Sequence, residues 1–160
     1  MKGGSMKLGD IMSRDVRTCT MSSSIGDCAK MMEEFKIGFL PVVDDNGVLV
    51  GTLTDRDIVR RAVAAGKGPD AKVEDIYSDE PVHLHSEGTL SDAEDAMMHG
   101  RIRRLVIIDD EKKPIGIISL AEIVRNEADP KRLKEVLESI LEPMREERTV
   151  EALAGTPCYG

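Results

Sequence analysis

Aromatic side chains are scarce in this 160-residue chain, which has two tyrosines, two phenylalanines and no tryptophan. A surface that stacks nucleic-acid bases needs several aromatic faces, so no such surface is expected. Basic residues are also in the minority, since 22 lysines and arginines stand against 30 acids and the net charge is −8. An acidic protein repels phosphate backbones and anionic membranes. Neither nucleic acid nor a membrane is therefore an expected partner.

Long apolar runs and paired cysteines are missing too. No apolar stretch approaches the roughly 20 residues that cross a bilayer, and the N-terminus lacks the apolar core of a signal peptide. Cys19, Cys28 and Cys158 form no Cys-x-x-Cys pair and leave an odd number. This usage argues against a disulfide framework and favours a reducing cytoplasm. Cys28 lies on the apolar face of an expected helix, where core packing is its expected role.

The most informative feature that is present is an internal duplication. Residues 7–60 align without a gap on residues 72–125, with 14 identities over 54 positions, among them Gly51 with Gly116. Each copy alone would be marginally stable, so the pair is expected to fold as one unit. Two copies imply an internal pseudo-two-fold axis, and a ligand cleft is expected where the copies meet.

Both copies predict the element order β-α-β-β-α. Apolar residues at helical spacing predict helices over 24–36 and 89–100, the first with Ile25, Cys28, Ala29, Met32 and Phe35 on its apolar face. The other expected elements are helical turns at 8–12 and 73–77, strands at 16–19, 39–43, 48–53, 82–84, 105–108 and 115–118, and closing helices at 54–65 and 119–125. Asp45-Asn46-Gly47 predicts a tight hairpin turn, because Asn-Gly favours positive φ. The expected fold class is α/β (α+β).

The expected organisation follows from the repeat. A flexible leader over 1–6 precedes one copy at 7–66, a linker at 67–71, a second copy at 72–126 and an extension at 127–160. The extension holds an amphipathic helix near 130–141, whose apolar stripe must pack on its own body or on a partner chain. The polar tail beyond it predicts no regular structure.

Each copy passes from a strand into a helix at a hydroxyl residue that is followed, three positions later, by an acid. These pairs are Thr54 with Asp57 and Ser119 with Glu122. Unpaired N–H groups at a helix start suit a phosphate, the hydroxyl could donate to it, and the carboxylate could accept a ribose diol. Gly51 and Gly116 would allow close approach of the backbone.

The same spacing also describes a helix-capping box. The two other repeat helices begin in this way, at Ser24 with Asp27 and at Thr89 with Asp92. On spacing alone, capping is the favoured interpretation of all four pairs.

The duplicated order, the run Gly38-Phe39-Leu40-Pro41-Val42-Val43-Asp44 before a hairpin, and Thr54-x-x-Asp57 followed by Ile-Val together resemble a pair of CBS domains, a Bateman module. The resemblance covers about residues 7–126. It implies two repeats packed sheet to sheet, with adenine nucleotides in the clefts between them. It also implies a flat disc of four repeats, in which the module pairs with a second copy.

The resemblance implies roles for individual residues. Thr54 would contact phosphate and Asp57 the ribose, with adenine near Tyr77, Val82 and Ile102. The full expected nucleotide-binding set is Gly38, Phe39, Thr54, Arg56, Asp57, Tyr77, Val82, Ile102, Arg103, Arg104, Ser119 and Glu122. Local positive charge is expected from Arg56, Arg60, Arg61, Arg101, Arg103 and Arg104, which also fit a solvated rim. Because Glu122 stands where the family usually has Asp, the Thr54/Asp57 cleft is the more strongly expected site.

The expected function is a ligand-sensing regulatory module for AMP, ADP or ATP, without enzyme activity, in the cytoplasm. No Walker-type loop, nucleophile–base pair or metal cluster appears in the sequence, and His83 and His85 lack a third ligand. The alternatives are an oligomerisation module with degenerate clefts and a sensor of NAD or S-adenosylmethionine. Adjacent methionines, Met31-Met32 and Met97-Met98, and the stripe at Leu133, Leu137 and Ile140 favour a homodimer. The downstream protein partner is not indicated.

Overall fold

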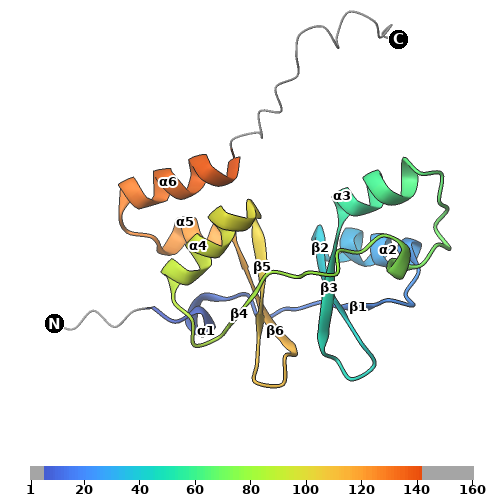
Figure 1. The fold of residues 1–160 in the computed structure, drawn as a ribbon, viewed down its shortest axis with the longest axis horizontal. Helices are drawn as coiled ribbons and strands as arrows, with labels where there is room; N and C mark the ends of the chain where they lie inside the picture. The colour runs from blue at the N-terminus through green and yellow to red at the C-terminus, as the bar shows by residue number, and fades with distance from the viewer. Residues whose placement is uncertain (1–5, 142–160) are drawn as a thin grey trace, which may run out of the picture.

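The computed structural model describes residues 6–141 and builds each copy around a three-stranded sheet (Figure 1). Repeat 1, the first copy, contains α1 (Leu8–Ile11), β1 (Cys19–Thr20), α2 (Ile25–Phe35), β2 (Phe39–Val43), β3 (Leu49–Thr54), α3 (Asp55–Asp57) and the π-helical η1 (Ile58–Val63). Repeat 2, the second copy, contains the 3₁₀ turn η2 (Val73–Asp75), β4 (His83–His85), α4 (Leu90–Gly100), β5 (Arg104–Ile108), β6 (Pro114–Ser119) and α5 (Leu120–Asn126). Helix α6 (Pro130–Leu141) follows.

The two sheets have the same topology, which confirms the expected fold class. In repeat 1 the order is β1-β2-β3, with β1 parallel and β3 antiparallel to β2; β4, β5 and β6 repeat this arrangement. Equivalent central residues pair in the two hairpins, Leu40 with Leu53 and Leu105 with Ile118. The first strand of repeat 1 is shorter and later than its pattern predicts, because pairing begins only at Cys19. That of repeat 2 has the expected length but begins one residue later, at His83.

An aspartate side chain stabilises each hairpin turn by accepting backbone hydrogen bonds. The Asp44 carboxylate accepts the N–H groups of Asn46 and Val48, both at 2.9 Å, and Asp109 accepts those of Glu111 and Lys113 at the same distance. Only one residue per turn has positive φ, Gly47 at 80° and Lys112 at 61°. The expectation that Asn46 would also adopt positive φ is therefore wrong, since its N–H is held by Asp44 instead.

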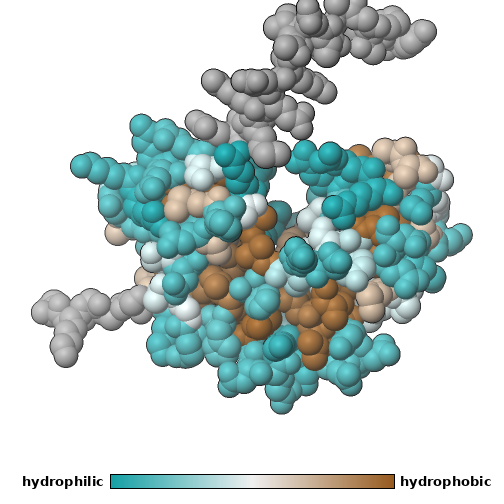
Figure 2. Space-filling view, in the orientation of Figure 1, coloured by the Kyte–Doolittle hydropathy of each residue, from teal (hydrophilic) through white to brown (hydrophobic). Residues whose placement is uncertain are grey.

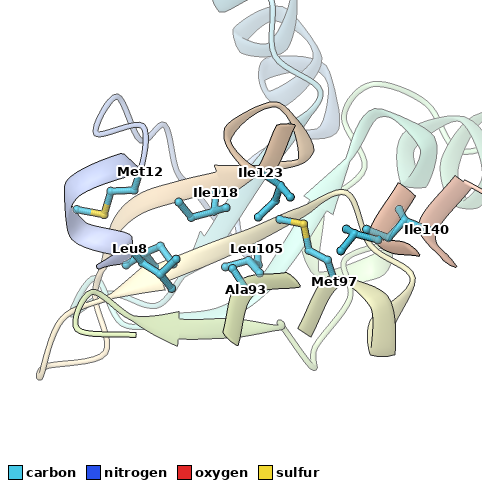
Figure 3. Close-up of a cluster of buried hydrophobic side chains, with 10 residues drawn as sticks. Leu8, Met12, Ala93, Met97, Leu105, Ile118, Ile123 and Ile140 are labelled. Atoms are coloured by element: carbon cyan, nitrogen blue, oxygen red, sulfur yellow. The ribbon is translucent and has the colours of Figure 1, made fainter. Parts of the chain in front are cut away.

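The opening segments of the two repeats are exchanged. Leu8 and Met12 of repeat 1 are buried in the core of repeat 2 beside Leu105 and Ile118 (Figure 3). Conversely, Val73 and Ile76 of repeat 2 are buried in the core of repeat 1. Each copy therefore completes the core of the other, which accounts for their folding as one unit.

This exchange gives Gly51 and Gly116 a structural role. A methyl group at Gly51 would overlap the ring of Tyr77 and the carbonyl oxygen of Ser78, and one at Gly116 would overlap the side chain of Met12. The expectation that these glycines admit a ligand backbone contact is wrong, because the exchanged segments fill the space.

Helix α2 buries a narrower face than its spacing predicts. Ile25, Cys28 and Met32 are buried, but Ala29 and Phe35 are exposed. The guanidinium of Arg17 lies 3.8 Å from the centre of the Phe35 ring, a cation–π contact that shelters it. The closing helix of repeat 1 also differs from expectation, because it passes from a single α turn into the π-helical η1.

Helix α6 packs on the chain's own body rather than extending toward a partner. Val136 and Ile140 are buried in the repeat 2 core, and Leu133 packs against it (Figure 3). Arg132 ties α6 to α4 through ion pairs from Nε to Glu94 at 2.9 Å and from Nη2 to Asp95 at 2.5 Å. Met31 and Met98 are half-buried, and each packs against the core of its own repeat. None of the described helices is long and apolar enough to cross a bilayer.

Candidate functional site

Thr54 and Asp57 form a complete capping box at the start of α3. The Thr54 hydroxyl accepts the N–H of Asp57 at 3.0 Å, and Oδ2 of Asp57 accepts the N–H of Thr54 at 2.9 Å. The capping interpretation is therefore confirmed. It leaves two groups for a ligand, because among residues 6–141 nothing accepts the hydroxyl proton of Thr54, and Oδ1 of Asp57 has only Arg61 near it, at 3.7 Å.

The backbone at the start of α3 offers no anion site. The N–H of Asp55 donates to the carbonyl of Gly38 at 3.1 Å, and that of Arg56 donates to Oδ1 of Asp55 at 2.8 Å. Since the N–H of Asp57 is held by Thr54, all three N–H groups of α3 are satisfied. The expectation of a backbone cradle for phosphate is therefore wrong, and side chains must supply the positive charge.

Arginine side chains supply the positive charge near the start of α3. A pocket of about 260 Å³ is lined by Arg56, Asp57, Arg60 and Arg61. Arg61 is held in place, because its Nη1 donates to the carbonyls of Ile76 and Tyr77 at 3.1 and 3.3 Å. Within the described ranges, neither Arg56 nor Arg60 forms an ion pair. Two unpaired guanidinium groups beside a carboxylate suit a ligand that carries both an anion and hydroxyl groups.

The expected flanking residues of repeat 1 lie at this helix start. Phe39 pairs with Thr54 across the β2–β3 hairpin, so Gly38 and Phe39 lie beside the capping box. A side chain at Gly38 would overlap the carboxylate of Asp55, so the glycine makes room for that carboxylate rather than for a ligand.

The equivalent site of repeat 2 is closed by its own hydrogen bonds. The Ser119 hydroxyl donates to Oε2 of Glu122 through a short hydrogen bond, and Oε2 also accepts the N–H of Ser119 at 2.8 Å. The other oxygen, Oε1, accepts from Nη1 of Arg125 at 3.2 Å. The Glu122 carboxylate therefore holds both the N–H and the hydroxyl of Ser119, so neither group is left free.

Arg103 and Arg104 lie at this second helix start. The carbonyl of Arg103 accepts the N–H of Leu120 at 2.9 Å, and Arg104 pairs with Ser119 across the hairpin. Both arginine side chains are exposed.

The three expected adenine contacts are divided between the repeats. Tyr77 packs against the repeat 1 core and Ile102 against the repeat 2 core, while Val82 is 37% exposed just before β4. Figure 2 shows the surface hollowed between the two repeats, with hydrophilic side chains on both rims. One ligand could therefore contact both Tyr77 and Ile102 only if it lay between the two repeats.

The sequence does not directly predict one polar contact of the site, between Ser78 and Arg61. The hydroxyl of Ser78 accepts from Nη1 of Arg61 at 3.3 Å, and Thr52 exchanges backbone hydrogen bonds with Ser78 at 2.9 Å in each direction. Ser78 aligns with Ser13, and both copies have serine at this position. The identity draws attention to Ser78 but does not predict its contact with Arg61. No cluster of metal-ligating residues occurs between residues 6 and 141, and His85 instead contacts Asp110 at 2.8 Å.

Known proteins share both sequence and fold with this chain. The CBS domain family profile matches residues 8–64 and 73–129. The CBS domain-containing protein YhcV of Bacillus subtilis is 36% identical over 118 residues, 74% of this chain and 83% of YhcV.

Some of the similar solved structures contain bound ligands. CBSX2 in complex with AMP superposes with a TM-score of 0.64 at 27% identity, covering 74% of this chain and 93% of CBSX2. The CBS domain pair of protein MJ0100, in complex with 5'-methylthioadenosine and S-adenosyl-L-methionine, superposes with a TM-score of 0.68 at 26% identity, covering 76% and 95%. Because the family profile matches both repeats, this chain belongs to the CBS domain family and is a CBS domain pair.

Proposed function

We propose that this CBS pair is a regulatory module that reversibly binds an adenine nucleotide, of the AMP, ADP or ATP class, at the Thr54/Asp57 site. The observation that carries the proposal is the pocket in which Arg56 and Arg60, which form no ion pair within residues 6–141, lie beside Asp57. The protein as a whole is acidic and repels anions, so a local concentration of positive charge is what allows an anionic ligand to bind here.

Different side chains bind the phosphate and the ribose of the nucleotide. Arg56 and Arg60 pair with the phosphate, and the Thr54 hydroxyl donates its free proton to a phosphate oxygen. Oδ1 of Asp57 accepts from the ribose hydroxyls while Oδ2 keeps the helix cap. The adenine lies between the repeats, with Tyr77, which packs on the repeat 1 core, and Ile102, which packs on the repeat 2 core, as its apolar contacts.

The AMP complex of CBSX2 supports this ligand class, and the adenosyl ligands of MJ0100 support a related one. S-adenosylmethionine carries a sulfonium cation where AMP carries its phosphate. The arginine-lined pocket therefore favours a nucleotide over S-adenosylmethionine at the Thr54/Asp57 site. The module itself performs no reaction in this proposal; ligand binding alone is its signal, read by a downstream protein.

A thermal-shift screen tests the proposal. A ligand that binds only the folded state at a hundred times its Kd stabilises it by about 2.7 kcal/mol, which raises the Tm of a chain of this size by roughly 5–10 °C. AMP, ADP or ATP should give such a shift, and NAD and S-adenosylmethionine a smaller one. No shift with any of the five compounds would favour an interaction module with degenerate clefts.

We also propose that the module forms a homodimer, as the exposed apolar side chains on its helices suggest. Light scattering should give a mass near twice 17.5 kDa.

A further inference from the structure

The guanidinium of Arg61 connects the two repeats at the candidate site. Its Nη1 donates to the carbonyls of Ile76 and Tyr77 at 3.1 and 3.3 Å, and to the hydroxyl of Ser78 at 3.3 Å. Its Nε lies 3.7 Å from Oδ1 of Asp57. One side chain of repeat 1 therefore contacts both the acid proposed to bind the ribose and the segment of repeat 2 that carries Tyr77.

The segment that Arg61 holds follows the short turn η2. Because η2 ends at Asp75, the carbonyls that come after it have no helical partner. Within the described residues, no backbone N–H donates to the carbonyl of Ile76 or of Tyr77. Arg61 therefore supplies the hydrogen bonds that hold these carbonyls on repeat 1.

Strand β3 holds the same segment through its backbone. Ser78 exchanges backbone hydrogen bonds with Thr52 at 2.9 Å in each direction, and the ring of Tyr77 lies so close to Gly51 that a methyl group there would overlap it. Strand β3 leads directly into α3, which carries Asp57. Two connections, the strand and the Arg61 side chain, thus set the position of Tyr77 relative to Asp57.

Repeat 2 has the first connection but not the second. A shift of 65 residues carries Ser13 to Ser78 and Arg61 to Asn126. Ser13 pairs with β6 as Ser78 pairs with β3. The amide Nδ2 of Asn126, however, donates at 2.7 Å to the carbonyl of Glu122 in its own helix. The side-chain connection therefore belongs to the copy whose candidate site is open, and it is replaced in the copy whose site is closed.

We propose that Arg61 is a positioning residue that holds Tyr77 of repeat 2 at a fixed distance from Asp57 of repeat 1. The base and the ribose of one nucleotide are then contacted together, while Arg56 and Arg60 bind the phosphate. Arg61 thereby sets the preference for a ligand that carries a base. The inference rests on the proposed nucleotide site and names the residue that couples its two halves.

Three variants separate this role from others. Arg61→Met removes the guanidinium from a side chain that is 51% exposed, so the fold should tolerate it. Arg61→Lys is milder, since it keeps the charge but not the planar group that bonds three acceptors. Asn126→Ala removes the hydrogen bond at the counterpart position and is the matched control. Circular dichroism and thermal melting confirm that each variant is folded.

Two ligands report on the two halves of the site. Calorimetry gives the Kd of AMP, and displacement of AMP gives the Kd of ribose 5-phosphate, which lacks the base. We expect Arg61→Met to raise the Kd of AMP roughly tenfold and that of ribose 5-phosphate by less than about threefold, the first change being that of one lost hydrogen bond to a charged group. Arg61→Lys should change the ratio in the same direction but less, and Asn126→Ala should bind both ligands as wild type does.

A double-mutant cycle tests whether Arg61 acts through Tyr77. Tyr77→Leu keeps an apolar side chain on the repeat 1 core but removes the ring. If Arg61 only positions that ring, adding Arg61→Met to Tyr77→Leu should raise the Kd of AMP no further. Independent losses that add in free energy would overturn the positioning role.

The remaining outcomes are equally defined. A Kd raised by the same factor for both ligands would make Arg61 a phosphate ligand or a general support, and would overturn the inference. An unchanged Kd of AMP in folded Arg61 variants, or an equal loss in Asn126→Ala, would also overturn it. Wild type that fails to bind AMP would remove the proposed nucleotide site itself. Wild type that binds AMP, with the ratio of the two Kd values unaltered in the Arg61 variants, would remove only the role of Arg61.

Discussion

Replacing Asp57 separates its two roles, as helix cap and as ligand for the ribose. Asp57→Ala removes Oδ2, which accepts the Thr54 N–H at 2.9 Å, and Oδ1, which faces the arginine pocket. Loss of the cap costs about 1 kcal/mol of folding stability, or roughly 2–4 °C in Tm for a chain of this size. Loss of a charged hydrogen-bond acceptor costs about 1.5–3 kcal/mol of binding free energy. The second cost corresponds to a Kd raised about 10- to 150-fold.

Two further variants isolate the binding cost. Asp92→Ala removes the other complete Thr–Asp capping box, in which Asp92 accepts the Thr89 N–H at 2.8 Å, at a helix start away from the arginine pocket. It should lower Tm by a similar amount and leave the Kd for AMP unchanged. Asp57→Asn keeps an oxygen for the cap but loses the charge, so it should weaken binding with little effect on Tm.

Isothermal titration calorimetry with AMP and thermal melting measure the two quantities. If Asp57→Ala binds AMP as tightly as wild type while losing stability, the residue is a cap only and the ribose assignment is refuted. If Asp92→Ala weakens binding equally, the loss reflects general destabilisation rather than contact with the ligand.

Three other changes have defined outcomes. Glu122→Asp shortens the side chain that closes the second site, so it should free Ser119 and add or tighten a second AMP site in calorimetry; one unchanged site would contradict this. Burial raises the pKa of Glu94, although Arg132 opposes the shift, so its contribution to stability is present below about pH 4.5 and is lost as pH rises. The unfolding free energy of Glu94→Gln should therefore rise relative to that of wild type as pH increases from 4.5 to 7.5. If urea titrations give the same difference in unfolding free energy at both pH values, the burial argument is contradicted. Gly51→Ala should cost roughly 1–3 kcal/mol in the same titrations, since the added methyl overlaps Tyr77; unaltered stability would refute the close packing of the exchanged segments.

The sequence predicts most of the fold because the two copies constrain one another. An element seen weakly in one copy is repeated in the other, so α2 and α4 and both hairpins lie close to their expected positions. The exchange of opening segments was not predicted, since it depends on which core each helical turn enters. Once it is seen, the identity of Gly51 with Gly116 is explained by the side chains of Tyr77 and Met12 that cover them.

The candidate site is predicted less completely, because its chemistry depends on which atoms are already bonded. Spacing alone cannot show that the backbone N–H groups of α3 are occupied by Gly38, Asp55 and Thr54. The sequence does indicate that the two candidate sites differ, because one has Asp57 where the other has Glu122. The structure supplies the physical reason: Glu122 accepts the Ser119 hydroxyl, whereas Asp57 leaves that of Thr54 free.

The sequence predicts that the last helix packs either on the chain's own body or on a partner. Side-chain spacing defines the apolar stripe of α6 but not the surface that it meets. Arg132 decides the matter, because it pairs with Glu94 and Asp95 on α4.

The most direct test of the nucleotide-sensing account is a calorimetric titration of the wild-type chain with AMP, with adenosine as the comparison. Adenosine keeps the base and ribose but lacks the phosphate that Arg56 and Arg60 would hold. We expect saturable binding of AMP with one dominant site per chain, and binding of adenosine that is weaker by at least tenfold. Equal affinities for the two compounds, or no heat from either at millimolar concentration, would contradict it.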